Sequence, residues 1–312
     1  MTAKVGLLVG RERSFPNALI EEINRRDVGV SAEYLRVGAV RMDRPPPYQV
    51  IIDRISHDVP GYQPILKLAA LAGCRVINNP FWRIADDKFF NAALASTRLG
   101  VRVPKTYVLP AKSYIADVTS DSLTNLELVD WKAIADDLGF PMFLKPHWGG
   151  GWRDVTRVNS LQELLAAYDR SGQKTMIVQE AIQWTQYVRC IVIGREDVLA
   201  APWDPRLSHF ERYTGAAKSM EPLTPIMLEK VHRDAKKLCV GLGYDMNTVE
   251  LAISGNDAYA IDFMNSAPDF DISSLGQEHF RWTVEKMADL AIRYAKNEGQ
   301  PPRRRFDDFL RS

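Results

Sequence analysis

Residues 4–79 alternate short apolar segments with amphipathic ones, and this alternation restricts the fold more than any other feature of the chain. We expect strands at 5–9, 31–37, 49–55 and 74–77, and helices at 16–26 and 64–72. Such alternation is typical of a parallel sheet, because each parallel pair needs a crossover that a helix usually supplies. The first strand ends at Gly10 with no G-x-G-x-x-G after it, so the segment predicts no dinucleotide site.

The rest of the chain is predicted to form two units in which strands and helices are mixed. After a helix at 84–98, the first unit has strands at 142–145, 155–158 and 176–179 and helices at 131–138 and 160–171. Ser160 followed by Glu163 is a capping box that opens the second of these helices. The second unit has strands at 187–194, 197–201, 246–253 and 258–263 and helices at 225–242 and 279–296.

Charge and hydropathy argue against several classes of function. Lys plus Arg is 40 and Asp plus Glu is 39, and the resulting net charge of +1 argues against a general nucleic-acid or membrane-surface binder. No stretch approaches the ~18 apolar residues that mark a membrane span. Cys74, Cys190 and Cys239 never form a C-x-x-C pair. The sequence therefore predicts neither a disulfide scaffold nor a zinc site, and a reducing cytoplasm fits best.

Two lysines stand in contexts that suit phosphate binding. Lys145 closes an apolar strand and is followed by Gly149, Gly150, Gly151 and Trp152. Consecutive glycines let backbone N–H groups approach phosphate oxygens, although a lysine at a strand end can also simply reach solvent and a glycine run can be a plain turn. Lys88 follows two aspartates at the start of a predicted helix. The chain contains no G-x-x-x-x-G-K-[ST], so this is not the common phosphate loop.

Two acids lie on strands that are predicted to be neighbours. Glu250 and Asp262 flank a hairpin turn at 254–257, and Asn265 follows the second strand. An acid within a strand usually points to solvent, but two carboxylates and an amide also supply the hard oxygen ligands that Mg²⁺ prefers. Between the glycine run and these acids, residues 176–182 read as a strand leading into a hinge. The backbone of such a segment can bind an adenine ring.

The order of these motifs resembles the ATP-grasp superfamily, most nearly the RimK-like carboxylate–amine ligases, from about residue 79 to residue 268. The resemblance implies an α/β and α+β protein with two α+β subdomains that clamp ATP, preceded by a Rossmann-like parallel-sheet domain. The expected divisions are 1–82 for the N-terminal domain, 83–179 for the linker helix and small subdomain, 180–298 for the subdomain with the acids, and 299–312 for the tail.

The resemblance also implies roles for individual residues. Lys88 and Lys145 would hold the α- and β-phosphates from separate units, meeting across a cleft with ATP between them. The 149–151 loop and Trp152 would cover the phosphates. Adenine would contact the hinge, and Mg²⁺ (one or two ions, or Mn²⁺) would bind the acids and the amide. The hinge residues are Gln179, Glu180, Ala181 and Ile182; the metal set is Glu250, Asp262 and Asn265; Arg189 and Arg212 are the expected catalytic cations.

Two positions depart from the family pattern. The family usually places an acid seven residues after the hinge glutamate, where it holds the ribose, and here that residue is Tyr187. The closing motif is usually acid-x-Asn, whereas Asp262 and Asn265 are separated by two residues. We expect a β-bulge within 262–265 to absorb the extra residue.

The activity implied is ATP-dependent joining of a carboxylate to an amine or a thiol through an acylphosphate. The expected partners are small-molecule or peptide substrates, with no nucleic acid and no membrane, and a homo-oligomer is compatible with the family. Two alternatives stay open: an ATP-grasp kinase or carboxylase with another acceptor, and a non-catalytic nucleotide-binding regulatory module. The sequence does not identify the acid or the amine.

Overall fold

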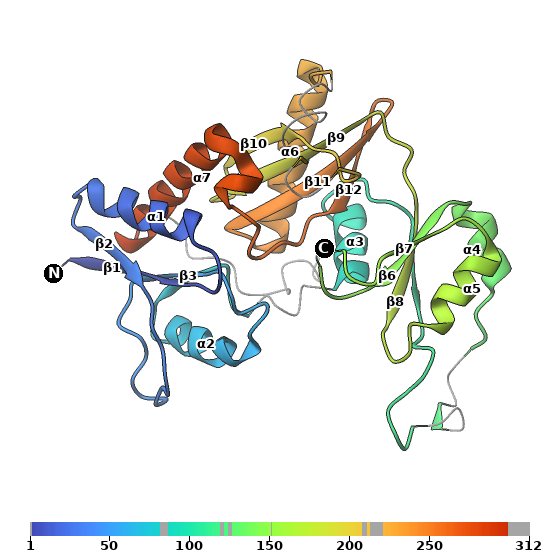
Figure 1. The fold of residues 1–312 in the computed structure, drawn as a ribbon, viewed down its shortest axis with the longest axis horizontal. Helices are drawn as coiled ribbons and strands as arrows, with labels where there is room; N and C mark the ends of the chain where they lie inside the picture. The colour runs from blue at the N-terminus through green and yellow to red at the C-terminus, as the bar shows by residue number, and fades with distance from the viewer. Residues whose placement is uncertain are drawn as a thin grey trace.

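Three four-stranded sheets follow one another along the chain (Figure 1). They are seen in a computed structural model that describes residues 2–81, 87–118, 122–123, 127–150, 152–207, 211–212 and 221–298. Within these ranges, no helix is long and apolar enough to cross a membrane. The three cysteines are buried and free.

The N-terminal sheet is parallel throughout, as the sequence predicts, with the strand order β2-β1-β3-β4. The middle of β3 is buried on both faces, as expected for a parallel strand covered by helices on either side. Helix α1 turns Phe15, Leu19 and Ile23 toward one face, at the four-residue spacing of an amphipathic helix. The elements are β1 (Ala3–Leu8), α1 (Ser14–Arg25), β2 (Val30–Tyr34), β3 (Val50–Asp53), the 3₁₀ turn η1 (Pro60–Tyr62), α2 (Gln63–Leu71) and β4 (Arg75–Ile77).

The second sheet is antiparallel, with the order β5-β8-β6-β7, and it forms a core of its own with two helices. Asp130 and Ser160 cap these helices, each accepting a hydrogen bond from the backbone N–H three residues on. Glu163 completes the second cap by binding the backbone N–H of Asn159 instead of that of Ser160. The elements are β5 (Thr106–Leu109), α4 (Trp131–Leu138), β6 (Met142–Pro146), β7 (Thr156–Val158), α5 (Leu161–Asp169) and β8 (Met176–Glu180).

The third sheet is also antiparallel, with the order β10-β9-β11-β12, and helices cover both of its faces. On one face α6 packs together with α3, and on the other lies α7. Gly243 ends α6 in the left-handed conformation that glycine adopts at helix C-termini. The elements are α3 (Lys88–Thr97), β9 (Gln186–Ile193), β10 (Asp197–Pro202), α6 (Pro225–Leu242), β11 (Met246–Ser254), β12 (Asp257–Asp262) and α7 (Ile272–Ala295).

The N-terminal and third sheets share one hydrophobic core, in which α7 packs against α1 and against β1 (Figure 1). Arg54 reinforces this junction, because its buried guanidinium binds both carboxylate oxygens of Glu12 and the carbonyl of Pro268. Asn78 bridges the same two units. Its side chain accepts from the backbone N–H groups of Asp245 and Met246 and donates to the carbonyls of Met246 and Ser266. The second sheet stands apart with its separate core.

Candidate active site

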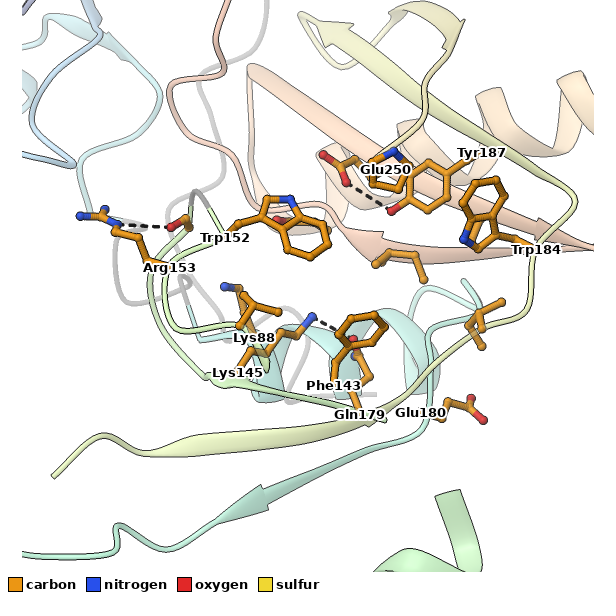
Figure 2. Close-up of a pocket in the computed structure, with 17 residues that line it drawn as sticks. Lys88, Phe143, Lys145, Trp152, Arg153, Gln179, Glu180, Trp184, Tyr187 and Glu250 are labelled. Carbon is orange, nitrogen blue, oxygen red and sulfur yellow. Dashed lines mark hydrogen bonds between the residues drawn. The ribbon is translucent and has the colours of Figure 1, made fainter. Parts of the chain in front are cut away.

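The largest group of predicted site residues meets in one cavity between the second and third sheets (Figure 2). Strands β6 and β8 and the start of α3 provide one wall, and β11 and β12 provide the other. Of the predicted residues that the structure describes, ten line the cavity: Lys88, Lys145, Gly150, Trp152, Gln179, Glu180, Ile182, Tyr187, Glu250 and Asp262.

The two lysines lie on the same wall of this cavity. Asp87 caps α3 by accepting from the backbone N–H groups of Phe89 and Phe90, and this cap places Lys88 at the helix start. The backbone N–H of Lys88 then donates to the carbonyl of His147 at 2.8 Å. Its ammonium donates to the carbonyl of Gly149 at 2.5 Å. The expectation that the lysines face each other across a cleft is therefore wrong, because these bonds fasten the start of α3 to the loop after β6.

The glycine loop lies beside both lysines. Gly149 has a φ of +102°, a conformation that suits glycine and strains residues with a side chain. Gly150 and Trp152 line the cavity, and Arg153, which the sequence reasoning missed, lines it next to them. Gly151 lies outside the described residues. The loop thus brings backbone and aromatic groups to the end of the cavity where the two lysines lie.

The ammonium of Lys145 is held in a partly desolvated position. It donates to the Gln179 side-chain oxygen at 2.8 Å. The pKa of Lys145 is lowered to about 8, chiefly by burial; the charges of Asp262 and Glu250 oppose the shift, and the charge of Lys88 contributes to it. A nearby anion stabilises the charged form of a partly desolvated ammonium. This property is expected of a lysine that binds phosphate.

The opposite wall carries the two acids. Glu250 and Asp262 are direct partners in the register of β11 and β12, so their side chains emerge from the same face of the sheet. The pKa of Glu250 is raised to about 7, chiefly by burial; the charge of Arg189 opposes the shift, and the charge of Asp262 contributes to it. Two carboxylates this close are stabilised by a cation between them.

The prediction of a β-bulge within 262–265 is wrong, and the irregularity in the pairing of β11 with β12 lies before Asp262. Strand β12 ends at Asp262, so 262–265 lies beyond the strand and cannot hold the bulge. The register instead shifts between Glu250 and Leu251, which pair with Asp262 and Ala260, and Ile261 is the extra residue. Successive strand residues normally point to opposite faces, yet both Ile261 and Asp262 line the cavity. The bulge explains this, because it reorients one of the two side chains.

Asn265 lies beside the cavity and is not part of its lining. Its side-chain nitrogen donates to the hydroxyl of Thr248 at 3.1 Å, and its backbone N–H donates to the side chain of Asn247. The amide oxygen is consequently the atom that could bind a metal. The sequence spacing alone did not reveal that Thr248, two residues from Glu250 on β11, sets this orientation.

Tyr187 stands where related proteins are expected to have an acid, and it is buried in an aromatic group. Its ring contacts Trp184 and Trp203, with centroid separations of 5.3 Å and 5.5 Å. Its hydroxyl donates to the carboxylate of Glu250 at 3.2 Å, and burial raises the tyrosine pKa well above its usual value. The hydroxyl therefore holds the Glu250 carboxylate, which is a different task from the ribose contact expected at this position.

The two predicted catalytic cations gather around Trp203. The guanidinium carbons of Arg189 and Arg212 lie 5.5 Å and 5.2 Å from its ring centre. Arg189 is 3.7 Å from the Glu250 carboxylate and donates to Thr248 at 3.1 Å. Neither arginine lines the cavity, but both lower the pKa of Glu250, which places their charge near the acids.

The hinge residues have mixed positions. The side chain of Gln179 binds Lys145, and Glu180 exchanges hydrogen bonds with the backbone of Lys105. Ile182 lines the cavity, and Ala181 is not among its lining residues. Adenine binding by this segment remains a prediction.

Several apolar residues of the cavity were missed by the sequence reasoning. Phe143 is two residues before Lys145 on β6, and Ala252 is two residues after Glu250 on β11, so strand alternation could have identified both. Trp184 lies between β8 and β9, where no periodicity points to it. The missed lining residues are Phe143, Arg153, Val155, Trp184, Pro205, Ala252 and Ile261.

The donor set fits a hard divalent cation that is bound together with phosphate. No cluster of three His, Cys, Asp or Glu side chains occurs within the described ranges. The chain would thus supply the Glu250 and Asp262 carboxylates and the Asn265 amide. Phosphate oxygens and water would complete the shell, as Mg²⁺ prefers.

Comparison with known proteins gives sequence relatives over part of the chain. No protein-family model matches it. The chain is 28% identical over 164 residues to a D-alanine–D-alanine ligase of Ralstonia nicotianae, covering 46% of this chain and 47% of the ligase. It is 27% identical over 187 residues to a formate-dependent phosphoribosylglycinamide formyltransferase of Acinetobacter baumannii, covering 54% of this chain and 46% of that protein. The chain thus spans about half the length of these curated relatives.

Solved structures match nearly the whole chain. A RimK domain ATP-grasp protein from Sphaerobacter thermophilus has a TM-score of 0.62 and 20% identity, covering 94% of this chain and 98% of that one. A D-alanine–D-alanine ligase from Bacillus anthracis complexed with ATP has a TM-score of 0.63 and 14% identity, covering 96% and 100%. The VanG D-Ala:D-Ser ligase from Enterococcus faecalis has a TM-score of 0.65 and 15% identity, covering 95% and 100%. The expected fold is confirmed: this chain has the ATP-grasp fold, preceded by a parallel-sheet domain.

Proposed function

We propose that this protein is an ATP-dependent ligase that joins a carboxylate to an amine, or to a thiol, through an acylphosphate. One observation carries the proposal. Lys88 and Lys145 share one wall of the cavity, and Glu250 and Asp262 share the opposite wall. A triphosphate between these walls would meet cations on one side and metal-binding acids on the other. Three of the similar proteins are named as ligases that act on D-alanine, and those names support the same chemistry.

Each group of residues has a physical task in this reaction. Phosphoryl transfer depends mainly on positioning and charge neutralisation. Lys88 and Lys145 would hold the α- and β-phosphates, with Gly149–Gly151 and Trp152 covering them. Phe143, Ile182 and Trp184 give apolar walls suited to the adenine ring. Arg189 and Arg212 would stabilise negative charge on the transferred phosphoryl group and on the acyl carbon's oxygen.

Magnesium held by Glu250, Asp262 and Asn265 would neutralise charge on the β- and γ-phosphates. The chain's own contribution is to keep that ligand set in place. Tyr187 donates to Glu250, and Thr248 accepts from both Asn265 and Arg189. These bonds hold the Glu250 carboxylate, the Asn265 amide and the Arg189 guanidinium in place before nucleotide binds.

The proposal is tested by trapping the acylphosphate. The full chain is incubated with MgATP, hydroxylamine and a panel of carboxylic acids that begins with D-alanine and other amino acids. Formation of a hydroxamate together with ADP, dependent on one acid, is the expected result. A Glu250→Gln, Asp262→Asn double variant should form neither, and a Glu298→Gln variant near the end of the described chain serves as a matched control.

Other outcomes separate the alternatives. A stable phosphorylated product with no hydroxamate would indicate a kinase. Binding of MgATP with no ADP formed across acids, amines and thiols would indicate a regulatory module. The proposal also includes small-molecule or peptide substrates that supply the carboxylate and the amine. It further includes a cytoplasmic location, the domain limits given above and self-association.

A further inference from the structure

A chain of three hydrogen bonds crosses the second sheet and ends at Lys145. The Thr106 hydroxyl donates to the carbonyl of Pro104 at 2.9 Å. The Gln179 side-chain nitrogen donates to the Thr106 oxygen at 2.8 Å, and the Lys145 ammonium donates to the Gln179 side-chain oxygen at 2.8 Å. Gln179 lies on the central strand β8, paired in register with Thr106 of β5 and with Phe143 of β6.

The chemistry of these groups permits one orientation of the Gln179 amide. An ammonium can only donate, so the amide atom that faces Lys145 must be the oxygen. The amide nitrogen then faces Thr106, which must accept. Thr106 can accept there because its single hydroxyl hydrogen is committed to Pro104. The carbonyl of Pro104 therefore determines, through two side chains, that Lys145 meets an acceptor.

Gln179 has little freedom to adopt another arrangement. Gln179 is only 6% exposed. Buried amides keep their hydrogen bonds, because a buried donor without an acceptor lowers the stability of the fold. Without the Thr106 oxygen, the buried amide nitrogen would have no acceptor at that position. If the amide then rotated by half a turn, its N–H₂ group would face the Lys145 ammonium, and two donors cannot bond.

We propose that Gln179 and Thr106 are positioning residues that aim the Lys145 ammonium at the nucleotide's phosphates. The inference rests on the proposed function, because it assigns the relay to the phosphate contact of that site. It gives Gln179 a task in holding Lys145, beyond the adenine contact expected from its place in the hinge. It also explains the Pro-Lys-Thr order at the start of β5, since the proline carbonyl and the threonine hydroxyl act together.

The test compares two ligands on the full chain by isothermal titration calorimetry. MgADP carries the phosphates that Lys145 would bind, and adenosine carries none. Thr106→Val keeps the shape of the side chain and removes the hydroxyl. Thr106→Ser keeps the hydroxyl and is the matched control. Gln179→Leu removes the hydrogen bonds to Thr106 and to Lys145 together. It is a second test of the inference if the valine variant folds poorly.

The expected result is selective for phosphate. Thr106→Val should weaken MgADP binding about tenfold or more and change adenosine binding less than about twofold, because one bond to a charged group is lost. Thr106→Ser should restore MgADP binding, and Gln179→Leu should weaken it at least as much as the valine change. Unchanged MgADP affinity in both disrupting variants would overturn the inference, as would equal weakening of both ligands. If the wild-type protein binds neither ligand, the proposed function fails, and the inference fails with it.

Discussion

Replacing Lys145 with methionine should make the unliganded protein more stable. Burial lowers the pKa of Lys145 from its usual 10.5 to about 8. A difference of that size corresponds to about 3 kcal/mol. Water in the cleft screens part of it, so we expect the unfolding free energy at pH 7 to rise by about 1–3 kcal/mol. Urea unfolding of the two proteins at several pH values measures this gain.

The sign of the pH dependence follows from the lowered pKa. Below pH 8 the lysine is protonated in both the folded and the unfolded chain, and the full penalty is present. Between pH 8 and 10.5 the unfolded chain binds more protons than the folded one, so the wild-type protein gains stability as pH rises. The advantage of the methionine variant should therefore be largest at neutral pH and should fade toward pH 10.5.

The same variant should lose its response to nucleotide. Thermal unfolding with and without MgATP should show stabilisation of the wild-type protein and little or none of Lys145→Met. Lys174→Met is the matched control in the same sheet domain, because Lys174 is 53% exposed and pairs with Asp154 at the surface. Its stability should change by about 0.5 kcal/mol or less. A methionine variant no more stable than wild type at pH 7, or one that keeps its MgATP response, would refute the reasoning.

Three further predictions concern the other side of the cavity and the domain junction. Glu250→Gln combined with Asp262→Asn should abolish Mg²⁺-dependent ADP formation; turnover at the wild-type rate in a coupled ADP assay would remove both acids from the site. Tyr187→Phe should lower the unfolding free energy by about 1 kcal/mol, because it removes the bond to Glu250. Calorimetry should show that it weakens MgADP binding, because Glu250 loses a hydrogen bond that holds it in the proposed magnesium ligand set, and that it leaves adenosine binding nearly unchanged. A large loss of adenosine affinity would restore Tyr187 as a ribose contact. Asn78→Ala should cost about 2–4 kcal/mol in urea unfolding, because it leaves buried backbone groups of Asp245, Met246 and Ser266 without partners. Asn256→Ala, on the exposed hairpin turn, is its control, and an equal loss in both would contradict the bridging role.

The sequence predicted the elements whose signals are local. The parallel sheet followed from strand–helix alternation, and the adjacency of the strands that carry Glu250 and Asp262 followed from a short turn between two apolar strands. The lysines and the glycine loop were found because each lies at the end of a predicted strand or at the start of a predicted helix. These signals depend on neighbours in the chain, which a sequence displays directly.

The wrong predictions concern side-chain and strand positions that depend on contacts between segments distant in the sequence. The two lysines share a wall because the backbone of Lys88 binds that of His147, a contact between residues far apart in the sequence. The bulge lies at Ile261 because β12 ends at Asp262, which depends on its pairing with β11. The tasks of Gln179 and Tyr187 depend on which side chains stand opposite them in the folded sheets. Residue spacing carries no information about such partners.

The packing of α7 against α1 has a consequence for how the chain acquires its structure during synthesis. The N-terminal sheet emerges from the ribosome first, yet the helix that shares its core, α7, is the last described element. Arg26, the residue that follows α1, also pairs with Asp289 of α7, which is 263 residues further along the chain. Contacts between such distant segments form slowly, because a long loop must close first. The part of α1 that contacts α7 must therefore stay exposed, or be bound by a chaperone, until α7 has been made.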